Sequence, residues 1–273
     1  MSNSATDPGY LRYQYADADK LRLRHQTHAL YSEQATSFLD WLMPTIDPQP
    51  GALVLDVGCG SGAYHPLLAK YNPRIVAIDA SQGMLDVVQQ QAQQQTLPVQ
   101  SMRAFAEALP LRDAACDRVM GNHMLYHVAD QLAALREMRR VLKPSGRVIL
   151  ATNAADSGQR LIDVHLEIAR TAGYTPLDER FDRGFSLNHL DLVREVFPNA
   201  ERRIYHDAFL FPTPEPALAY YASGVIDMIA ERPADGSHRA RLMPLFEKRV
   251  QEIIEREGVF RVPKSSGCFV AEI

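Results

Sequence analysis

The feature that most constrains the fold is a regular alternation of short apolar runs and helical patterns between residues 52 and 152. Continuous apolar runs indicate buried strands, and apolar residues spaced three or four apart indicate helices. Strands are expected at 52–57, 74–78, 99–104, 116–121 and 147–152, and helices at 64–71, 83–95 and 130–142. Strands that alternate with helices predict an α/β fold with a parallel sheet and right-handed crossovers.

The pattern changes on both sides of this segment. A helical pattern covers 17–42, and helices are expected at 156–172, 187–197 and 217–256. Further strands are expected at 203–211 and 267–273. We therefore predict a helical cap at 1–50, a core at 51–153, and a third part at 154–273. That third part should hold helical lid insertions and the last two strands, which complete the sheet.

Composition limits the partners and location of this chain of 273 residues. Its net charge of -4 gives no overall positive field, which disfavours nucleic acid and anionic membrane as partners. Cys59, Cys116 and Cys268 are odd in number and lack metal-type spacing, so neither a disulfide framework nor a metal site is expected. No apolar signal core opens the sequence, and no run approaches the roughly 18 apolar residues of a membrane span. We expect a cytoplasmic protein.

The most informative segment is a glycine loop that follows the first expected strand. Residues 54–62 read Val-Leu-Asp-Val-Gly-Cys-Gly-Ser-Gly, with glycine at 58, 60 and 62, and a helix comes next. Glycine permits positive φ and lets a ligand approach the backbone closely. The helix start adds free N–H groups and a partial positive charge. These properties suit a nucleotide-like ligand at the carboxyl end of the strand.

Two aspartates narrow the kind of ligand. Asp56 precedes the loop, where it would repel a pyrophosphate, and the G-x-G-x-G spacing differs from the dinucleotide pattern G-x-G-x-x-G. A carboxylate at this place instead suits S-adenosylmethionine, because this ligand carries a positively charged ammonium and sulfonium. Asp79 ends the second strand about 20 residues later, the spacing at which an acid accepts both ribose hydroxyls. The alternative is that Asp79 only caps the following helix.

Further motifs cover the rest of the segment. They are Ala-Glu-Ala-Leu-Pro-Leu at 106–111, Cys-Asp-Arg-Val at 116–119, Tyr-His-Val-Ala-Asp at 126–130 and Arg-Val-Leu-Lys-Pro-Ser-Gly at 140–146. With the glycine loop and Asp79, they make 52–152 resemble the class I methyltransferases, in particular the type 11 branch. Two departures stand out: Pro-Ser-Gly replaces the usual Pro-Gly-Gly at 144–146, and Phe105 replaces an acidic residue. Phe105 removes a carboxylate near the adenine amino group and leaves an aromatic ring that can flank the base.

The resemblance implies a fold and a cofactor. The fold is a Rossmann-like, seven-stranded, mostly parallel sheet with helices on both faces, plus a helical lid. The cofactor is S-adenosyl-L-methionine. Its methionine part should lie against Asp56, Gly58, Cys59, Gly60 and Asn122, its ribose on Asp79, and its adenine beside Ala80, Met84, Phe105 and Ala106. Tyr10, Arg12 and Tyr13 are weaker candidates to cover it.

The acceptor should lie near residues 122–127, which follow the fourth strand. Methyl transfer is an in-line displacement, so alignment and exclusion of water supply most of the acceleration. His123 or His127 would take a proton if the acceptor carries one, and Tyr126 would orient the acceptor. Alternatively, one of the histidines packs or caps the helix that begins near Asp130. Four aromatic residues either line the acceptor pocket or belong to the core: Phe209, Phe211, Tyr220 and Tyr221.

The predicted function is S-adenosylmethionine-dependent methyl transfer to a small-molecule acceptor. One alternative is an RNA or protein methyltransferase, but no basic stripe and no Asn-Pro-Pro-aromatic motif follows the fourth strand. Another is a cofactor-binding protein that catalyses a reaction other than methylation. A nicotinamide-dependent dehydrogenase is disfavoured by the glycine spacing and by Asp56. The sequence leaves the acceptor atom and the oligomeric state open.

Overall fold

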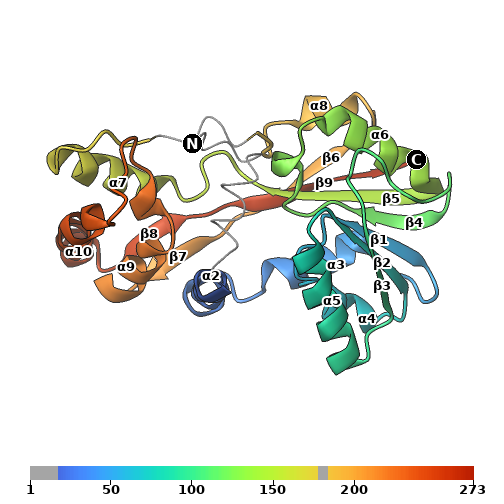
Figure 1. The fold of residues 1–273 in the computed structure, drawn as a ribbon, viewed down its shortest axis with the longest axis horizontal. Coiled ribbons are helices and arrows are strands. Elements are labelled where there is room, and N and C mark those ends of the chain that lie inside the picture. Colours follow the sequence, from blue (N-terminus) through green and yellow to red (C-terminus); the bar gives the residue numbers. More distant parts are fainter. Residues whose placement is uncertain (1–17, 178–183) are drawn as a thin grey trace. The chain divides into compact units, whose positions relative to one another are not determined.

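The computed structural model of this chain describes residues 18–177 and 184–273 (Figure 1). They fold as two compact units. The sheet unit consists of Thr36–Ala154, Gly184–Tyr205 and Ser266–Ile273, and the described part of the helical unit of residues 18–35, 155–177 and 206–265. Every described helix is too short or too polar to cross a lipid bilayer. The division into cap, core and lid stays a prediction, because it concerns roles as well as boundaries.

The sheet unit is built on a seven-stranded sheet in the order β3-β2-β1-β4-β5-β9-β6 (Figure 1). The strands are β1 (Leu53–Val57), β2 (Arg74–Asp79), β3 (Val99–Arg103), β4 (Cys116–Met120), β5 (Leu142–Asn153), β6 (Glu201–Tyr205) and β9 (Ser266–Glu272). Pairing is parallel from β3 through β5, and β9 is antiparallel to both β5 and β6. This confirms the predicted α/β fold with a mostly parallel sheet.

Helices cover both faces of this sheet. They are α3 (Phe38–Ile46), α4 (His65–Ala69), α5 (Gln82–Gln95), α6 (Gln131–Val141) and α8 (Leu190–Arg194), with a short 3-10 helix η1 (Leu125–His127). Neighbouring strand residues point to opposite faces. Accordingly Leu55 packs in one core with α6 and α8, whereas Val54 packs in another with α3 and α4. Both faces are therefore buried, as expected of a parallel sheet.

Polar side chains cap the first turns of the helices that follow β2 and β4. Ser81 is the N-cap of α5, and its hydroxyl accepts a hydrogen bond from the Met84 N–H at 3.4 Å. Asp130 is the N-cap of α6 and accepts from the Ala133 N–H at 2.9 Å. Such side chains satisfy N–H groups that lack a partner inside the helix. Asp130 therefore caps α6, a role that was one alternative for His123 or His127.

The helical unit holds a small antiparallel sheet and its own core. Its elements are α2 (Ala18–Tyr31), α7 (Gln159–Thr171), β7 (Ala208–Phe211), α9 (Pro214–Ala222), η3 (Val225–Asp227), α10 (Ser237–Glu257) and β8 (Phe260–Pro263). β7 pairs with β8. The Tyr221 ring stacks on Phe246 with centroids 4.0 Å apart, which adds an aromatic contact to the burial of both side chains.

Three predictions for the flanking segments were wrong in detail. The helical pattern at 17–42 forms two helices, because Ser37 caps a new start for α3. The predicted strand at 203–211 is two strands, β6 and β7, that belong to different sheets. The helical region at 217–256 splits into α9, η3 and α10, and β8 was not predicted. The partners of these strands lie far along the chain, which a local pattern does not reveal.

Asp207, which lies between β6 and β7, forms a buried ion pair. The Asp207 carboxylate, which is 4% exposed, binds the Lys264 ammonium. It also accepts from the Ser32 hydroxyl at 2.6 Å and from the N–H of Ala208 at 2.7 Å. Burial raises the pKa of the Asp207 carboxyl, but the hydrogen bonds from Lys264 and Ser32 outweigh this and hold the pKa below its usual range. Asp207 is thus a charged anchor inside the helical unit.

Replacing Asp207 by Ala should destabilise the protein by about 3–5 kcal/mol, because it leaves the Lys264 ammonium buried without its partner. Urea denaturation followed by circular dichroism measures the loss. The double variant Asp207→Asn/Lys264→Met removes both charges and should be less destabilised than Asp207→Ala alone. A loss below about 1 kcal/mol for Asp207→Ala would contradict a buried anchoring role.

Candidate functional site

The glycine loop joins β1 to α4 at the carboxyl end of the sheet's parallel strands. Gly58 and Gly60 both have positive φ, +65° and +53°. A Cβ on Gly58 would lie 2.6 Å from the Met124 Cβ, so packing requires glycine there. A Cβ on Gly60 would meet no heavy atom within 4 Å. The backbone at Gly60 therefore faces open space, where a ligand can approach it closely.

Asp79 ties the end of β2 to this loop. One carboxylate oxygen accepts the Gly60 N–H at 2.9 Å, and the other accepts the Ser81 N–H at 2.8 Å. The side chain is half-buried, and each carboxylate oxygen can accept a second hydrogen bond. Ser81, not Asp79, caps α5. The geometry suits the predicted ribose contact, which stays a prediction.

Asp56 is buried, and its partner was not anticipated. One carboxylate oxygen lies 3.0 Å from the Nε2 of His65, and the side chains are 2% and 1% exposed. Asp56 was predicted to lie against the methionine part of the cofactor, whereas His65 was not among the predicted site residues. No spacing rule links a residue before a glycine loop to one at the start of the next helix. Only the fold of the loop reveals this pair.

Cys59 lies within the loop and is half-buried. Its N–H donates to the carbonyl of Ile78 at 3.0 Å, which adds a second link between the loop and β2. Burial, then the nearby carboxylates of Asp56 and Asp79, raise the pKa of the Cys59 thiol well above its usual range. The thiol therefore stays protonated, so this residue can offer a ligand its backbone but not a thiolate.

The residues predicted beside the adenine follow two neighbouring strands. Asp79 of β2 is in register with Arg103 of β3, and the Arg103 side chain donates to the Ala80 carbonyl at 2.9 Å. Phe105 comes two residues later and is 64% exposed. Ala106 is buried and Met84 is half-buried. An exposed aromatic ring at this strand end is a surface on which a flat base can stack.

Asn122 follows β4 and carries an unusual buried amide. Its Oδ1 accepts the Ala151 N–H of β5 at 3.3 Å, which fixes the side chain. Its Nδ2 is buried and has no hydrogen-bond partner among the described residues. An unpaired buried donor costs about 1–3 kcal/mol. A ligand that accepts a hydrogen bond here would remove that cost, so this atom fits a binding site at the strand ends.

The three candidates for the acceptor side have different surroundings. His123 has a φ of +55°, and its ring lies 5.6 Å from that of Phe38. Burial lowers the pKa of His123 to about 4, so its imidazole is neutral at pH 7 and a weak base. Tyr126 and His127 lie together in η1, half-buried, with ring centroids 4.4 Å apart. Of the two histidines, His127 has the better surroundings for a base, and all three roles stay predictions.

Most of the aromatic residues considered for an acceptor pocket belong to the core of the helical unit. Phe209, Phe211 and Tyr221 are buried there, and Tyr220 packs against the same cluster. His165 is buried in the same unit, and its Nδ1 lies 2.8 Å from the Tyr221 hydroxyl. These three buried aromatic residues therefore belong to the core, which was the alternative to a place in an acceptor pocket. Tyr10, Arg12 and Tyr13, the weaker candidates to cover the cofactor, lie outside the described residues.

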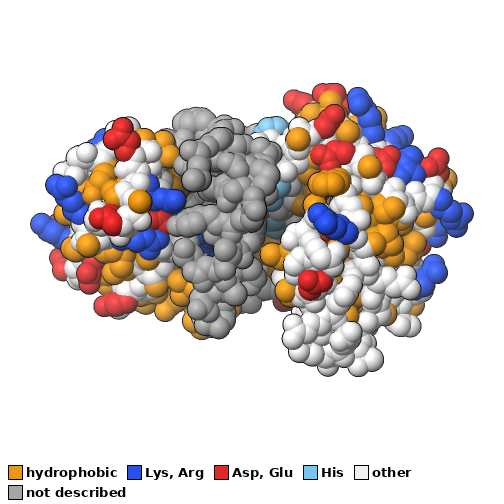
Figure 2. All heavy atoms as spheres, viewed as in Figure 1, with side chains coloured by type: hydrophobic (Ala, Val, Ile, Leu, Met, Phe, Trp, Pro, Cys, Tyr) orange, Lys and Arg blue, Asp and Glu red, His pale blue; other side chains and the backbone are white. Residues whose placement is uncertain are grey.

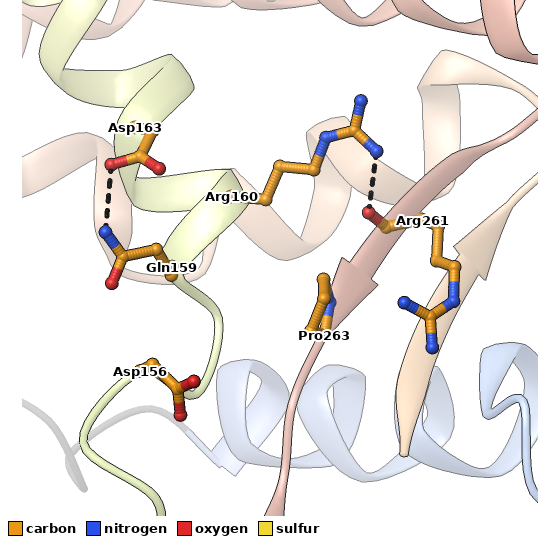
Figure 3. Close-up of a pocket in the computed structure, with 6 residues that line it drawn as sticks. All are labelled: Asp156, Gln159, Arg160, Asp163, Arg261 and Pro263. Atoms are coloured by element: carbon orange, nitrogen blue, oxygen red, sulfur yellow. Dashed lines mark hydrogen bonds between the residues drawn. The ribbon is translucent and has the colours of Figure 1, made fainter. Parts of the chain in front are cut away.

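A separate hollow lies in the helical unit, between α7 and β8 (Figure 3). Its lining residues are Asp156, Gln159, Arg160, Asp163, Arg261 and Pro263. Arg160 donates to the Arg261 carbonyl at 3.1 Å and pairs with Glu257, and Arg261 pairs with Glu33. Both guanidinium groups are thus held by protein carboxylates. None of the predicted site residues lines this hollow.

Comparison with known families identifies the family of the central part of the sheet unit. Residues 55–150 match the family described as a methyltransferase domain. This stretch includes the glycine loop, Asp79, Phe105 and Asn122. The chain contains a class I methyltransferase domain of the type 11 branch. The predicted family is confirmed, and the strand-end site described above lies within the matched segment.

Two relatives and one solved structure illustrate the similarity. The domain is 34% identical over 119 residues to a malonyl-[acyl-carrier protein] O-methyltransferase of Serratia marcescens, over 44% of this chain and 45% of that protein. It is 33% identical over 121 residues to a ubiquinone biosynthesis O-methyltransferase of Ruegeria pomeroyi, over 44% of this chain and 49% of that protein. The aligned stretches thus span less than half of each relative. A putative methyltransferase from an antibiotic biosynthesis pathway of Anabaena variabilis shares the fold, with a TM-score of 0.59 and 19% identity over 86% of this chain and 96% of that chain.

The low pKa of His123 predicts an acid-dependent loss of stability. Between pH 6.5 and about 4 the unfolded chain binds a proton at this histidine and the folded chain does not. Stability should therefore fall across this window, by up to about 1.4 kcal/mol per pH unit from this group. His123→Asn, whose side chain tolerates positive φ, should lose less stability than the wild type between pH 7 and 4.5 in urea denaturation. Equal losses would contradict the assigned shift.

Proposed function

We propose that this chain transfers a methyl group from S-adenosyl-L-methionine to a small-molecule acceptor. The observation that carries the proposal is the convergence of three groups at the ends of β1, β2 and β4. These groups are the open backbone of Gly60, the half-buried carboxylate of Asp79 and the unpartnered buried amide of Asn122. Ligands of open α/β sheets bind at these strand ends.

The residues present fit the cofactor. Asp79 would accept the ribose hydroxyls through the lone pairs that Gly60 and Ser81 leave available. The methionine part would lie against Gly58, Cys59, Gly60 and Asn122 with Asp56 as a nearby negative charge, and the adenine against Ala80, Met84, Phe105 and Ala106. S-adenosyl-L-methionine supplies, when bound, a methyl group on a positively charged sulfur.

A small acceptor is favoured over a polynucleotide. On the face shown in Figure 2, Lys and Arg side chains of the described residues are interspersed with Asp and Glu and form no continuous basic stripe. The net charge of -4 points the same way. The relatives named above are O-methyltransferases of malonyl-[acyl-carrier protein] and of ubiquinone biosynthesis, which supports the same class. For an acceptor that must lose a proton, we assign His127 as the base and Tyr126 as the orienting group.

Replacing Asp79 by Asn should weaken cofactor binding at least about tenfold, because hydrogen bonds to a charged acceptor are worth about 1.5–3 kcal/mol each. Isothermal titration with S-adenosylhomocysteine or S-adenosylmethionine measures the change. Asp86→Asn is the matched control, since Asp86 lies exposed on α5 and bonds only to the Gln82 side chain in the described structure. Its affinity should equal that of the wild type. Binding of NAD in place of both nucleosides would overturn the cofactor assignment.

Methyl transfer itself is tested with a labelled methyl group. The wild-type protein, incubated with S-adenosylmethionine and a small-molecule metabolite extract, should yield a product heavier than its precursor by about 14 mass units plus the excess mass of the isotope label, while Asp79→Asn yields much less because it binds the cofactor poorly. Mass spectrometry detects the product. If the cofactor binds but broad extracts give no labelled product, the proposal of methylation fails in favour of another reaction.

A further inference from the structure

The contact between Asp56 and His65 connects the glycine loop to the first turn of α4. The pair lies in the interior of the sheet unit, and both side chains are at most 2% exposed. Asp56 lies in β1, two residues before Gly58. We therefore expect a substitution of His65 to affect the glycine loop through the buried Asp56 carboxylate.

The His65 ring is fixed from two sides. A Cβ on Gly62 would lie 2.5 Å from the His65 Nδ1, so the ring packs directly against the backbone at Gly62. The His65 N–H donates to the Gly62 carbonyl at 3.0 Å, and the Gly62 N–H donates to the Cys59 carbonyl at 2.9 Å. The ring thus spans the space between the end of the loop and Asp56.

The hydrogen bonds of the ring indicate its proton arrangement. Nε2 faces the Asp56 carboxylate at 3.0 Å, and a carboxylate only accepts, so Nε2 carries a proton. Nδ1 is buried and has no partner among the described residues. A second proton on Nδ1 would create a buried donor with nothing to bind, which is costly. Nε2 is therefore the nitrogen through which the ring holds the Asp56 carboxylate.

Two titratable neighbours of the pair stay protonated. They are the phenol of Tyr64, next to His65 in the chain, and the thiol of Cys59 in the loop. Burial, then the Asp56 carboxylate, raise the pKa of each above its usual range. Asp79 lies at the other side of the loop and bonds to Gly60. Neither the phenol nor the thiol supplies a positive charge beside Asp56.

We propose that His65 is a positioning residue for the cofactor. Its imidazole fixes the position of the buried Asp56 carboxylate by a hydrogen bond at 3.0 Å. A negative charge is thereby kept below the glycine backbone, where it favours a ligand that carries an ammonium and a sulfonium. The inference rests on the proposed function, since the ligand that profits from this charge is the proposed cofactor.

A matched pair of substitutions separates this role from packing. His65→Gln places an amide N–H near the position of Nε2, whereas His65→Leu offers no donor, and both remove the ring. His65→Leu should bind S-adenosylmethionine about tenfold or more weakly than the wild type, and His65→Gln within about threefold of it. The melting temperatures without ligand should fall to a similar extent. Equal affinities of the two variants would overturn the proposal. If His65→Leu does not fold, His65→Asn replaces it, because its shorter amide does not reach Asp56.

A double-mutant cycle tests whether His65 acts through Asp56. Titration of Asp56→Asn and of Asp56→Asn/His65→Leu should give similar affinities, because the charge that His65 positions is already gone. Additive losses would overturn the proposal. The wild-type titration keeps the two hypotheses apart. If the wild type does not bind S-adenosylmethionine, the proposed function fails. If it binds and His65→Leu binds as tightly, only the role of His65 fails.

Discussion

The hydrogen bond from the Gly60 N–H to the Asp79 carboxylate is the interaction on which the site depends. It joins the loop after β1 to the end of β2, and the Cys59 N–H adds a second link to Ile78. Both links need β1 and β2 to be parallel neighbours, because only then do the two carboxyl ends meet at one edge. The positive φ of Gly60 turns its N–H toward the carboxylate and keeps the other side of the loop open. The parallel pairing of β1 and β2 is therefore required both by the sheet and by the site.

The charges around the loop follow from the same geometry. Asp79 receives two backbone donors and stays half-buried, whereas Asp56 is fully enclosed and receives an imidazole donor. Enclosed carboxylates are unfavourable unless hydrogen bonds satisfy them. Each aspartate therefore has hydrogen-bond partners, while the neighbouring Cys59 thiol stays protonated. The loop lies between two negative groups, an arrangement that suits a cationic ligand better than a pyrophosphate.

The sequence was informative where structure is set by local pattern. The runs at 52–57 and 74–78 became β1 and β2 with bounds close to those predicted, because strands of a parallel sheet are buried on both faces and read as continuous apolar runs. The run at 203–211 was misread, since its two halves pair with different, distant strands and are separated by Asp207. His65 was missed because its partner is fixed by the turn of the loop. The unpartnered amide of Asn122 depends on Ala151 of β5, which is remote in sequence.

The place of β9 in the sheet has a consequence for the order in which the protein assembles. β9 lies between β5 and β6, and Arg147 of β5 is in register with Glu272 of β9 although 125 residues separate them. By contrast, β2 pairs with both of its neighbours along the chain, β1 and β3. Pairings between distant residues form slowly, because a long loop must close first. The half of the sheet that carries the glycine loop can therefore form early, while the other half waits for its central strand.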